Sequence, residues 1–138
     1  MIDSTNGVQT GTATIAAGAT STTATIGTVV PAQSILWFEV SHNEASPNSG
    51  SISGQITNGT TLTFQRQGTT GAVAIRYHVA YFSSGVTVQR GAAAKNGAAT
   101  VNVSISPVNL AQSFVLISER RSGGGFDGAG FVRARLST

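Results

Sequence analysis

The sequence predicts an all-β protein, an antiparallel β-sandwich or jelly-roll-like fold of about ten short strands. Charged residues make up only 9% of the 138 residues, and Gly, Ser, Thr, Ala and Val take their place. That mixture weakens helices and packs well on a pleated surface. Several stretches alternate apolar and polar residues with a period of two, and glycine-containing turns separate them at short intervals.

The first half of the chain contains an apolar run and an apparent hairpin. Residues 1–7 are expected to form a flexible N-terminal arm, and residues 8–138 a single β-sandwich domain. The continuous apolar run 34–38 predicts a central strand that is covered on both faces. Residues 60–83 predict a hairpin, because its second arm, 73–81, alternates apolar and polar residues after a glycine-rich turn.

The second half carries the same kinds of pattern. Residues 101–105 alternate valine and isoleucine with polar residues, which is typical of a half-buried strand. The run 113–117 is continuously apolar and predicts another central strand. In the last predicted strand, 132–136, Arg133 and Arg135 lie on the face opposite to the apolar side chains.

Three blocks of sequence recur at an offset of about 80 residues, which predicts an internal repeat. The matching blocks are 8–11 with 88–91, 32–34 with 111–113, and 52–57 with 132–137. We expect a first repeat over 8–83 and a truncated second repeat over 86–138, which stops where the first begins its hairpin. Either the two halves share that hairpin, or an edge stays open for a neighbouring subunit to complete. The open edge would indicate a homo-oligomer, a trimer or a dimer.

Few residues are available for chemistry. The chain has no cysteine, two histidines and five acidic residues. His42, Glu44 and Asp127 are candidate metal ligands, but loop residues of these types are usually solvated. No pair of carboxylates and no nucleophile with its base stands out. We therefore expect no catalytic residues, no metal and no cofactor, and a protein that is not an enzyme.

Charge, aromatic content and the length of the apolar stretches argue against nucleic-acid and membrane partners. The net charge is +3, which is a small excess, and only 7% of the residues are aromatic. Nucleic-acid binders concentrate many more cations on one face and interleave stacking rings. No stretch approaches the roughly 18 apolar residues of a membrane span. We expect no nucleic-acid partner and no membrane partner.

One charged cluster is a candidate interface. Arg120 and Arg121 precede the glycine-rich loop that contains Phe126, and Arg133 and Arg135 follow it. In one interpretation these arginines are solvated strand residues that discourage edge aggregation. In the other they form, with Phe126, an interface to an acidic partner surface or an anionic glycan, because guanidinium groups suit carboxylates, phosphates and sulfates.

The aromatic residues bear on glycan binding. Exposed Trp or Tyr rings commonly form the platforms on which sugars stack. Trp37 lies in the run that is predicted to be covered on both faces, and Tyr77 and Tyr81 share a face with the apolar residues of 73–81. We therefore expect all three rings to belong to the core, which makes a glycan-binding module the alternative interpretation.

Stretches such as TNGTTLTFQRQGTTGAVAIRYHVAYFSSGVTVQRG, residues 57–91, resemble small virion structural proteins of tailed double-stranded-DNA bacteriophages, and the resemblance covers most of the chain through both copies of the recurring blocks. The resemblance implies a capsid decoration or cement protein that binds at capsid subunit junctions and stabilises the shell. Its partner would be the major capsid protein or another virion protein, on the particle surface after assembly in the host cytoplasm. The alternative is a tail-associated or fibre-associated host-adhesion module that binds a surface glycan.

Overall fold

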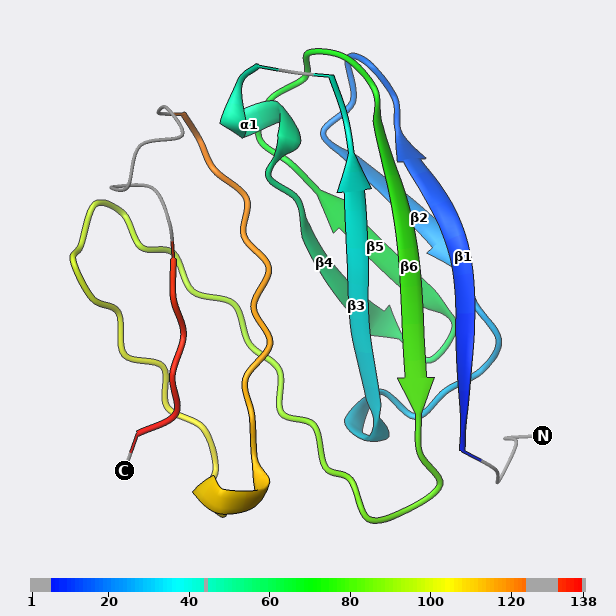
Figure 1. Ribbon diagram of the computed structural model, residues 1–138, viewed down its shortest axis with the longest axis vertical. Coiled ribbons are helices and arrows are strands. Elements are labelled where there is room, and N and C mark those ends of the chain that lie inside the picture. The colour runs from blue at the N-terminus through cyan, green and yellow to red at the C-terminus, as the bar shows by residue number, and fades with distance from the viewer. Residues whose placement is uncertain (1–5, 44, 124–131, 138) are drawn as a thin grey trace.

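The computed structural model describes residues 6–43, 45–123 and 132–137. These residues contain six strands in two three-stranded antiparallel sheets (Figure 1). The strands are β1 (Gly7–Ile15), β2 (Ser21–Thr25), β3 (Ser34–Ser41), β4 (Ser53–Asn58), β5 (Thr61–Gln65) and β6 (Val73–Tyr81). The all-β prediction is confirmed. The predicted number of about ten strands is wrong for the described residues, because the extended segments after residue 82 form no ladder.

The chain crosses repeatedly between the two sheets. One sheet has the strand order β1-β6-β3 and the other β2-β5-β4. Among consecutive strands only β4 and β5 pair with each other. The predicted hairpin at 60–83 is therefore wrong, because β5 and β6 are the central strands of different sheets. Both strands are paired on both sides within the first part of the chain, so the two halves do not share them.

Side chains from both sheets form one buried core. Leu62 and Phe64 of β5 contribute from one sheet, and Ile75 and Tyr77 of β6 from the other. The Phe64 and Tyr77 rings stack with 6.0 Å between their centroids. Tyr77 is 7% exposed, which confirms its predicted place in the core, and Tyr81 packs against the core half-buried. The central strands dominate the core because each has a neighbour on both sides.

Strand β3 is an edge strand, so the prediction that 34–38 forms a central strand is wrong. Phe38 and Val40 pack against the core, whereas Trp37 points outward and is 41% exposed. The prediction that Trp37 belongs to the core is also wrong. The apolar run is misleading because the outward Trp37 ring is partly covered by the ring of His78 on β6, and not by a second layer of structure.

Arg66 joins three loops at one end of the two sheets. Its side chain is 1% exposed, and its guanidinium nitrogens donate hydrogen bonds of 2.8–3.5 Å to six backbone carbonyl oxygens. The acceptors belong to Ala16, Ala19, Ser49, Thr69, Thr70 and Gly71. These bonds offset the cost of burying the charge. Because Arg66 directly follows β5, they also fix the loop through which the chain crosses to β6.

Helical structure in the described residues is short. It comprises one turn of α-helix, α1 (Pro47–Gly50), and two 3-10 turns, η1 (Pro31–Gln33) and η2 (Leu110–Gln112). Proline at the start of α1 and of η1 suits the first helical turn, where its missing N–H costs nothing. In the part of the chain that is described, no helix has the length and apolar character needed to cross a membrane.

The residues after 82 run beside the two sheets, next to β3 and β4 (Figure 1). Hydrogen bonds to backbone groups join this second part to the first at turn η1 and at strand β4, among other places. The Val88 N–H donates to the Ala32 carbonyl oxygen at 2.8 Å. The Gly54 N–H, on edge strand β4, donates to the Ser118 hydroxyl at 3.1 Å. The second part is thus docked against turn η1, which precedes β3, and against edge strand β4.

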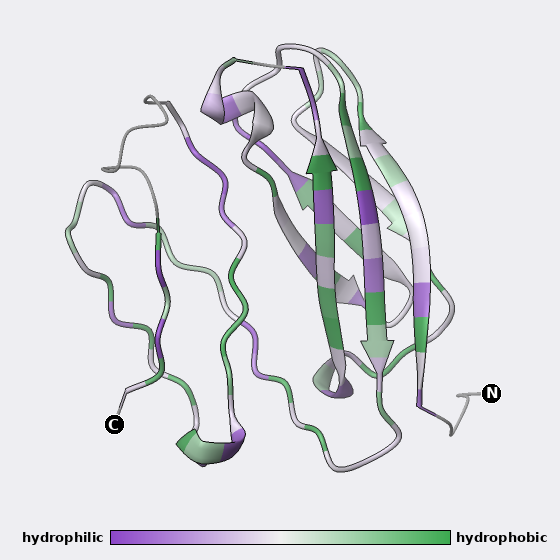
Figure 2. Ribbon diagram, viewed as in Figure 1, coloured by the Kyte–Doolittle hydropathy of each residue, from purple (hydrophilic) through white to green (hydrophobic). Residues whose placement is uncertain are grey.

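The predicted strands at 101–105 and 113–117 adopt extended backbones without ladder partners among the described residues. Figure 2 shows that both segments carry many hydrophobic residues. The prediction that 113–117 is a central strand is therefore wrong, and Phe114 at its start is 69% exposed. A central strand needs a neighbour on both sides, and residues 83–123 and 132–137 supply none.

Candidate functional site

A glutamine on β1 holds the segment that follows β2. The Gly27 N–H donates to Gln9 Oε1 at 2.7 Å, and Gln9 Nε2 donates to the Gly27 carbonyl oxygen at 3.1 Å. A Cβ atom at residue 27 would lie 3.0 Å from Gln9 Oε1, so glycine suits this close approach. The pair of bonds links the first strand of one sheet to the segment leaving the other sheet.

The second part contains the same arrangement. The Ser106 N–H donates to Gln89 Oε1 at 2.7 Å, and Gln89 Nε2 donates to the Ser106 carbonyl oxygen at 3.0 Å. Gln89 follows Gln9 by 80 residues, and Ser106 follows Gly27 by 79. In each part, a glutamine side chain therefore hydrogen-bonds both the N–H and the carbonyl oxygen of one residue, and the two pairs lie at matching places in the sequence.

The two 3-10 turns correspond in the same way. Turn η2 follows η1 by 79 residues, and each is followed by a serine in extended conformation. Ser34 has φ −133° and ψ 146°, and Ser113 has φ −131° and ψ 150°. Local backbone structure thus recurs at the offset at which the sequence recurs.

By this offset, residues 100–104 and 133–137 correspond to β2 and β4. In the first part, β5 lies between β2 and β4 and pairs with both. In the second part the corresponding region is a cleft of about 470 Å³. Its lining residues are Val101, Asn102, Val103, Ile105, Ser106, Pro107, Val108, Leu110, Arg135, Leu136 and Ser137. The cleft therefore lies where a central strand would fit.

Apolar side chains are exposed to solvent along the cleft and along the neighbouring segment 113–117. Val103 is 55% exposed and Ile105 is 47% exposed. The residue that corresponds to Ile105 in the first part, Ile26, is 7% exposed and belongs to the core. A row of exposed apolar side chains of this kind marks a surface for protein association.

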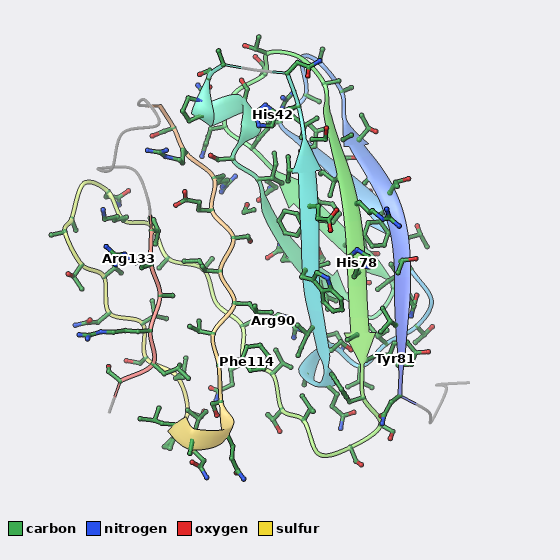
Figure 3. All side chains as sticks on the ribbon, in the orientation of Figure 1. His42, His78, Tyr81, Arg90, Phe114 and Arg133 are labelled. Carbon is green, nitrogen blue, oxygen red and sulfur yellow. The ribbon has the colours of Figure 1, made fainter. Side chains whose placement is uncertain are left out.

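Positive charge is concentrated in the second part. Six of the eight Lys and Arg residues follow residue 82. Of the predicted interface residues, Arg135 lines the cleft, and Arg133 on the same segment is exposed (Figure 3). Arg120 is exposed and Arg121 is half-buried at the end of the other apolar segment. Phe126 lies outside the described residues, so its predicted place in the interface stays a prediction.

Arg90 fastens the start of the second part to the first, a role that the sequence interpretation missed. Its guanidinium donates to the carbonyl oxygens of Pro31, the first residue of turn η1, and of Ser34, which directly follows the turn. The residue is exposed as a whole, but partial desolvation of the charged group lowers the pKa of Arg90 from its ordinary value. Thr10 stands at the matching position of the first part. This difference between the matching sequence blocks 8–11 and 88–91 is the sequence signal that could have found it.

A second exposed feature lies on the outer face of the sheet that contains β3 and β6. Trp37 and His78 are paired across these strands, and their rings stack with 5.2 Å between centroids and 10° between planes. Glu39 and Arg76 form the next outward pair in the register, and Thr10 on β1 faces His78. The result is an aromatic platform with polar neighbours on a sheet face, of which His78 is labelled in Figure 3.

The candidate metal ligands do not define a site in the described residues. Glu44 and Asp127 lie outside those residues, and within them no three His, Asp or Glu side chains gather where they could hold an ion. The His42 ring lies close to Gly50, where a Cβ atom would clash with it. The ring therefore takes part in packing α1 against the end of β3.

Comparisons of the chain with protein-family models, with curated proteins and with solved structures found no match. The features of the molecule that bear on function are the cleft, the exposed apolar segments and the aromatic platform. The cleft and the apolar segments belong to the second part of the chain, and the platform belongs to the first.

Proposed function

We propose that this protein is a non-enzymatic structural protein whose second part docks onto another protein. The observation that carries the proposal is the open cleft that residues of the segments 101–110 and 135–137 line, with apolar side chains exposed beside it. Extended segments without ladder partners present backbone N–H and C=O groups that a partner strand can satisfy. Burial of the exposed apolar side chains would supply the driving force.

We infer that the two parts are a complete and an incomplete copy of one β-sandwich unit. The recurring sequence blocks, the paired glutamine contacts of Gln9 and Gln89, and the matching turns η1 and η2 support this inference. The complete copy owes its stability to the two central strands β5 and β6. The incomplete copy has segments for the outer positions only, so its function is to receive strands from elsewhere.

The resemblance to virion proteins of tailed bacteriophages suggests where the partner is found. We propose a capsid decoration or cement protein that binds at junctions between capsid subunits, with the major capsid protein or another virion protein as partner. Strand addition at such a junction would bury apolar surface on both proteins and reinforce the shell. The arginines near the cleft favour an acidic surface on the capsid side.

Purified particles test this proposal. We expect the protein to be present in hundreds of copies on the head, counted by quantitative mass spectrometry and located by electron microscopy. Empty shells that lack it should break at lower temperature than shells to which it has been added back. A handful of copies at the tail tip would contradict decoration, and absence from particles would contradict a virion role altogether.

The exposed stack of Trp37 on His78 favours a second candidate function, a host-adhesion module that binds a glycan. Exposed aromatic rings with polar neighbours are suited to sugar stacking. Decoration remains the first proposal because the platform is a single indole–imidazole stack on a sheet face, whereas exposed apolar side chains lie along the cleft. A glycan array probed with the protein and with Trp37→Ala decides this point. Binding that disappears in the variant would support adhesion, and no binding by either protein would exclude it for the glycans displayed.

A further inference from the structure

We propose that the cleft of the second part binds an acidic β-arch, meaning two strands joined by a loop that enter different sheets. The inference rests on the proposed docking function and names the chemistry of the docking segment. The first strand of the arch would lie between 100–104 and 133–137. The second would lie against the apolar segment 113–120.

The first part of the protein provides the template for this segment. Strands β5 and β6 form such an arch, and each lies at the centre of its sheet. Leu62 of β5 is paired with Ala24 on one side and with Ile56 on the other. The matching positions in the second part are Val103 and Leu136, and both line the cleft. An apolar residue at this place in the arch would therefore be buried between two apolar neighbours.

The charge of the partner follows from the same register. On β5, Thr63 is paired with Gln55, and Gln65 is paired with Ser53. The positions that match Gln55 and Ser53 are Arg135 and Arg133. Residues of the incoming strand that stand where Thr63 and Gln65 stand would thus lie directly opposite two arginines. Opposite charges in directly facing cross-strand pairs are favourable, and like charges are unfavourable.

A second copy of this chain does not meet the requirement. Each chain has one arch, β5 with β6, and two places that need an arch. Exchange of arches between copies would therefore leave one place empty in every chain. The arch of this protein also carries Thr63 and Gln65, which do not complement two arginines. The segment that fits is consequently absent from residues 1–138, and it alternates acidic with apolar side chains.

Peptides based on the arch of the first part test the proposal with the full-length chain. The parent peptide has the sequence of residues 59–83. An acidic version carries Thr63→Glu and Gln65→Glu, and a basic version carries Thr63→Lys and Gln65→Lys. Binding is measured by calorimetry, and the binding site by hydrogen exchange with mass spectrometry.

We expect the acidic peptide to bind one per chain, about tenfold more tightly than the basic peptide, and to slow exchange at 100–104 and 133–137. Raising the salt concentration should reduce the difference. Arg133→Ser and Arg135→Gln together place the residues of the first repeat at these positions. This double variant should bind the acidic and basic peptides equally and should still bind the parent peptide.

A matched pair of variants separates binding at the cleft from general effects. Val103 is 55% exposed and lines the cleft, and Val8 is 57% exposed on the outer face of β1. Val103→Asp should prevent binding of the acidic peptide, and Val8→Asp should not. Unchanged thermal unfolding of both variants in the absence of peptide establishes that the loss is one of binding.

Three results would overturn the inference. These are no binding of the acidic peptide, equal binding of the acidic and basic peptides, and a stable dimer in which exchange at 100–104 and 133–137 is already slow. The last result would assign the cleft to a second copy. If the protein decorates particles but does not bind the acidic peptide, the arch inference is wrong and the proposed function stands. If the protein binds the acidic peptide but is absent from particles, the proposed virion role is wrong and the arch inference stands.

Discussion

The Tyr77 ring lies over Gly11 on the neighbouring strand. These residues are directly paired between β6 and β1, and a Cβ atom at residue 11 would clash with the Tyr77 hydroxyl oxygen. The same relationship joins Tyr81 to Gly7, four residues earlier on β1. Two glycines on the inner face of an edge strand thus provide the space that two tyrosines of the central strand fill.

Gly11→Ala should destabilise the protein by about 1–3 kcal/mol, because the added methyl group overpacks a site that is already filled by a rigid ring. Chemical denaturation monitored by circular dichroism measures the change. Thr12→Ala, on the exposed outer face of the same strand, serves as the control and should change stability by less than about 0.5 kcal/mol. Equal effects of the two substitutions would contradict the packing described for Tyr77.

Arg66→Met should destabilise the protein by about 3–5 kcal/mol, since it removes the donors for six carbonyl oxygens and leaves several of them buried. Arg66→Lys should recover little, because an ammonium group cannot reach acceptors arranged around a planar guanidinium. Thermal unfolding measures both variants. Arg76→Met, at an exposed position on β6, should have a small effect, and a comparable loss there would refute the specific role of Arg66.

The two glutamines should give separable local effects. Gln9→Ala should destabilise the first part by about 1–2 kcal/mol, because it removes two hydrogen bonds to Gly27. Gln89→Ala should speed hydrogen exchange at the Ser106 amide and leave exchange at Gly27 unchanged. Exchange measured residue by residue with nuclear magnetic resonance distinguishes these outcomes. If Gln89→Ala left the Ser106 amide unaffected, the paired arrangement in the two parts would not hold in solution.

Trp37 is the only tryptophan of the chain, so intrinsic tryptophan fluorescence reports on this one position. The exposed ring should emit at long wavelength and should be quenched readily by acrylamide. His78→Ala should increase the quenching further, because the imidazole covers one face of the indole. Emission at short wavelength with poor quenching would instead mean that the outer face of this sheet is covered in solution.

The sequence predicts which segments of the first part are strands, but it does not predict where each strand lies in its sheet. The period-two alternation of 73–81 identified strand β6 and the buried face to which Tyr77 belongs. The run 34–38 predicts a central strand because it is continuously apolar and so places apolar side chains on both faces. Alternation reveals which residues of a strand share a face, but it does not reveal which strand lies beside it. The interpretation of 60–83 as a hairpin failed for the same reason.

The sequence by itself determined the all-β class, because backbone preferences and side-chain periodicity are local properties, and it shows three blocks that recur at an offset of about 80 residues. Only the tertiary structure decided that β5 and β6 enter different sheets, that Arg66 is buried among carbonyl oxygens, and that Arg135 lines a cleft. Each of these depends on contacts between residues far apart in the chain. Such contacts are set by how the sheets face each other, which no local pattern encodes.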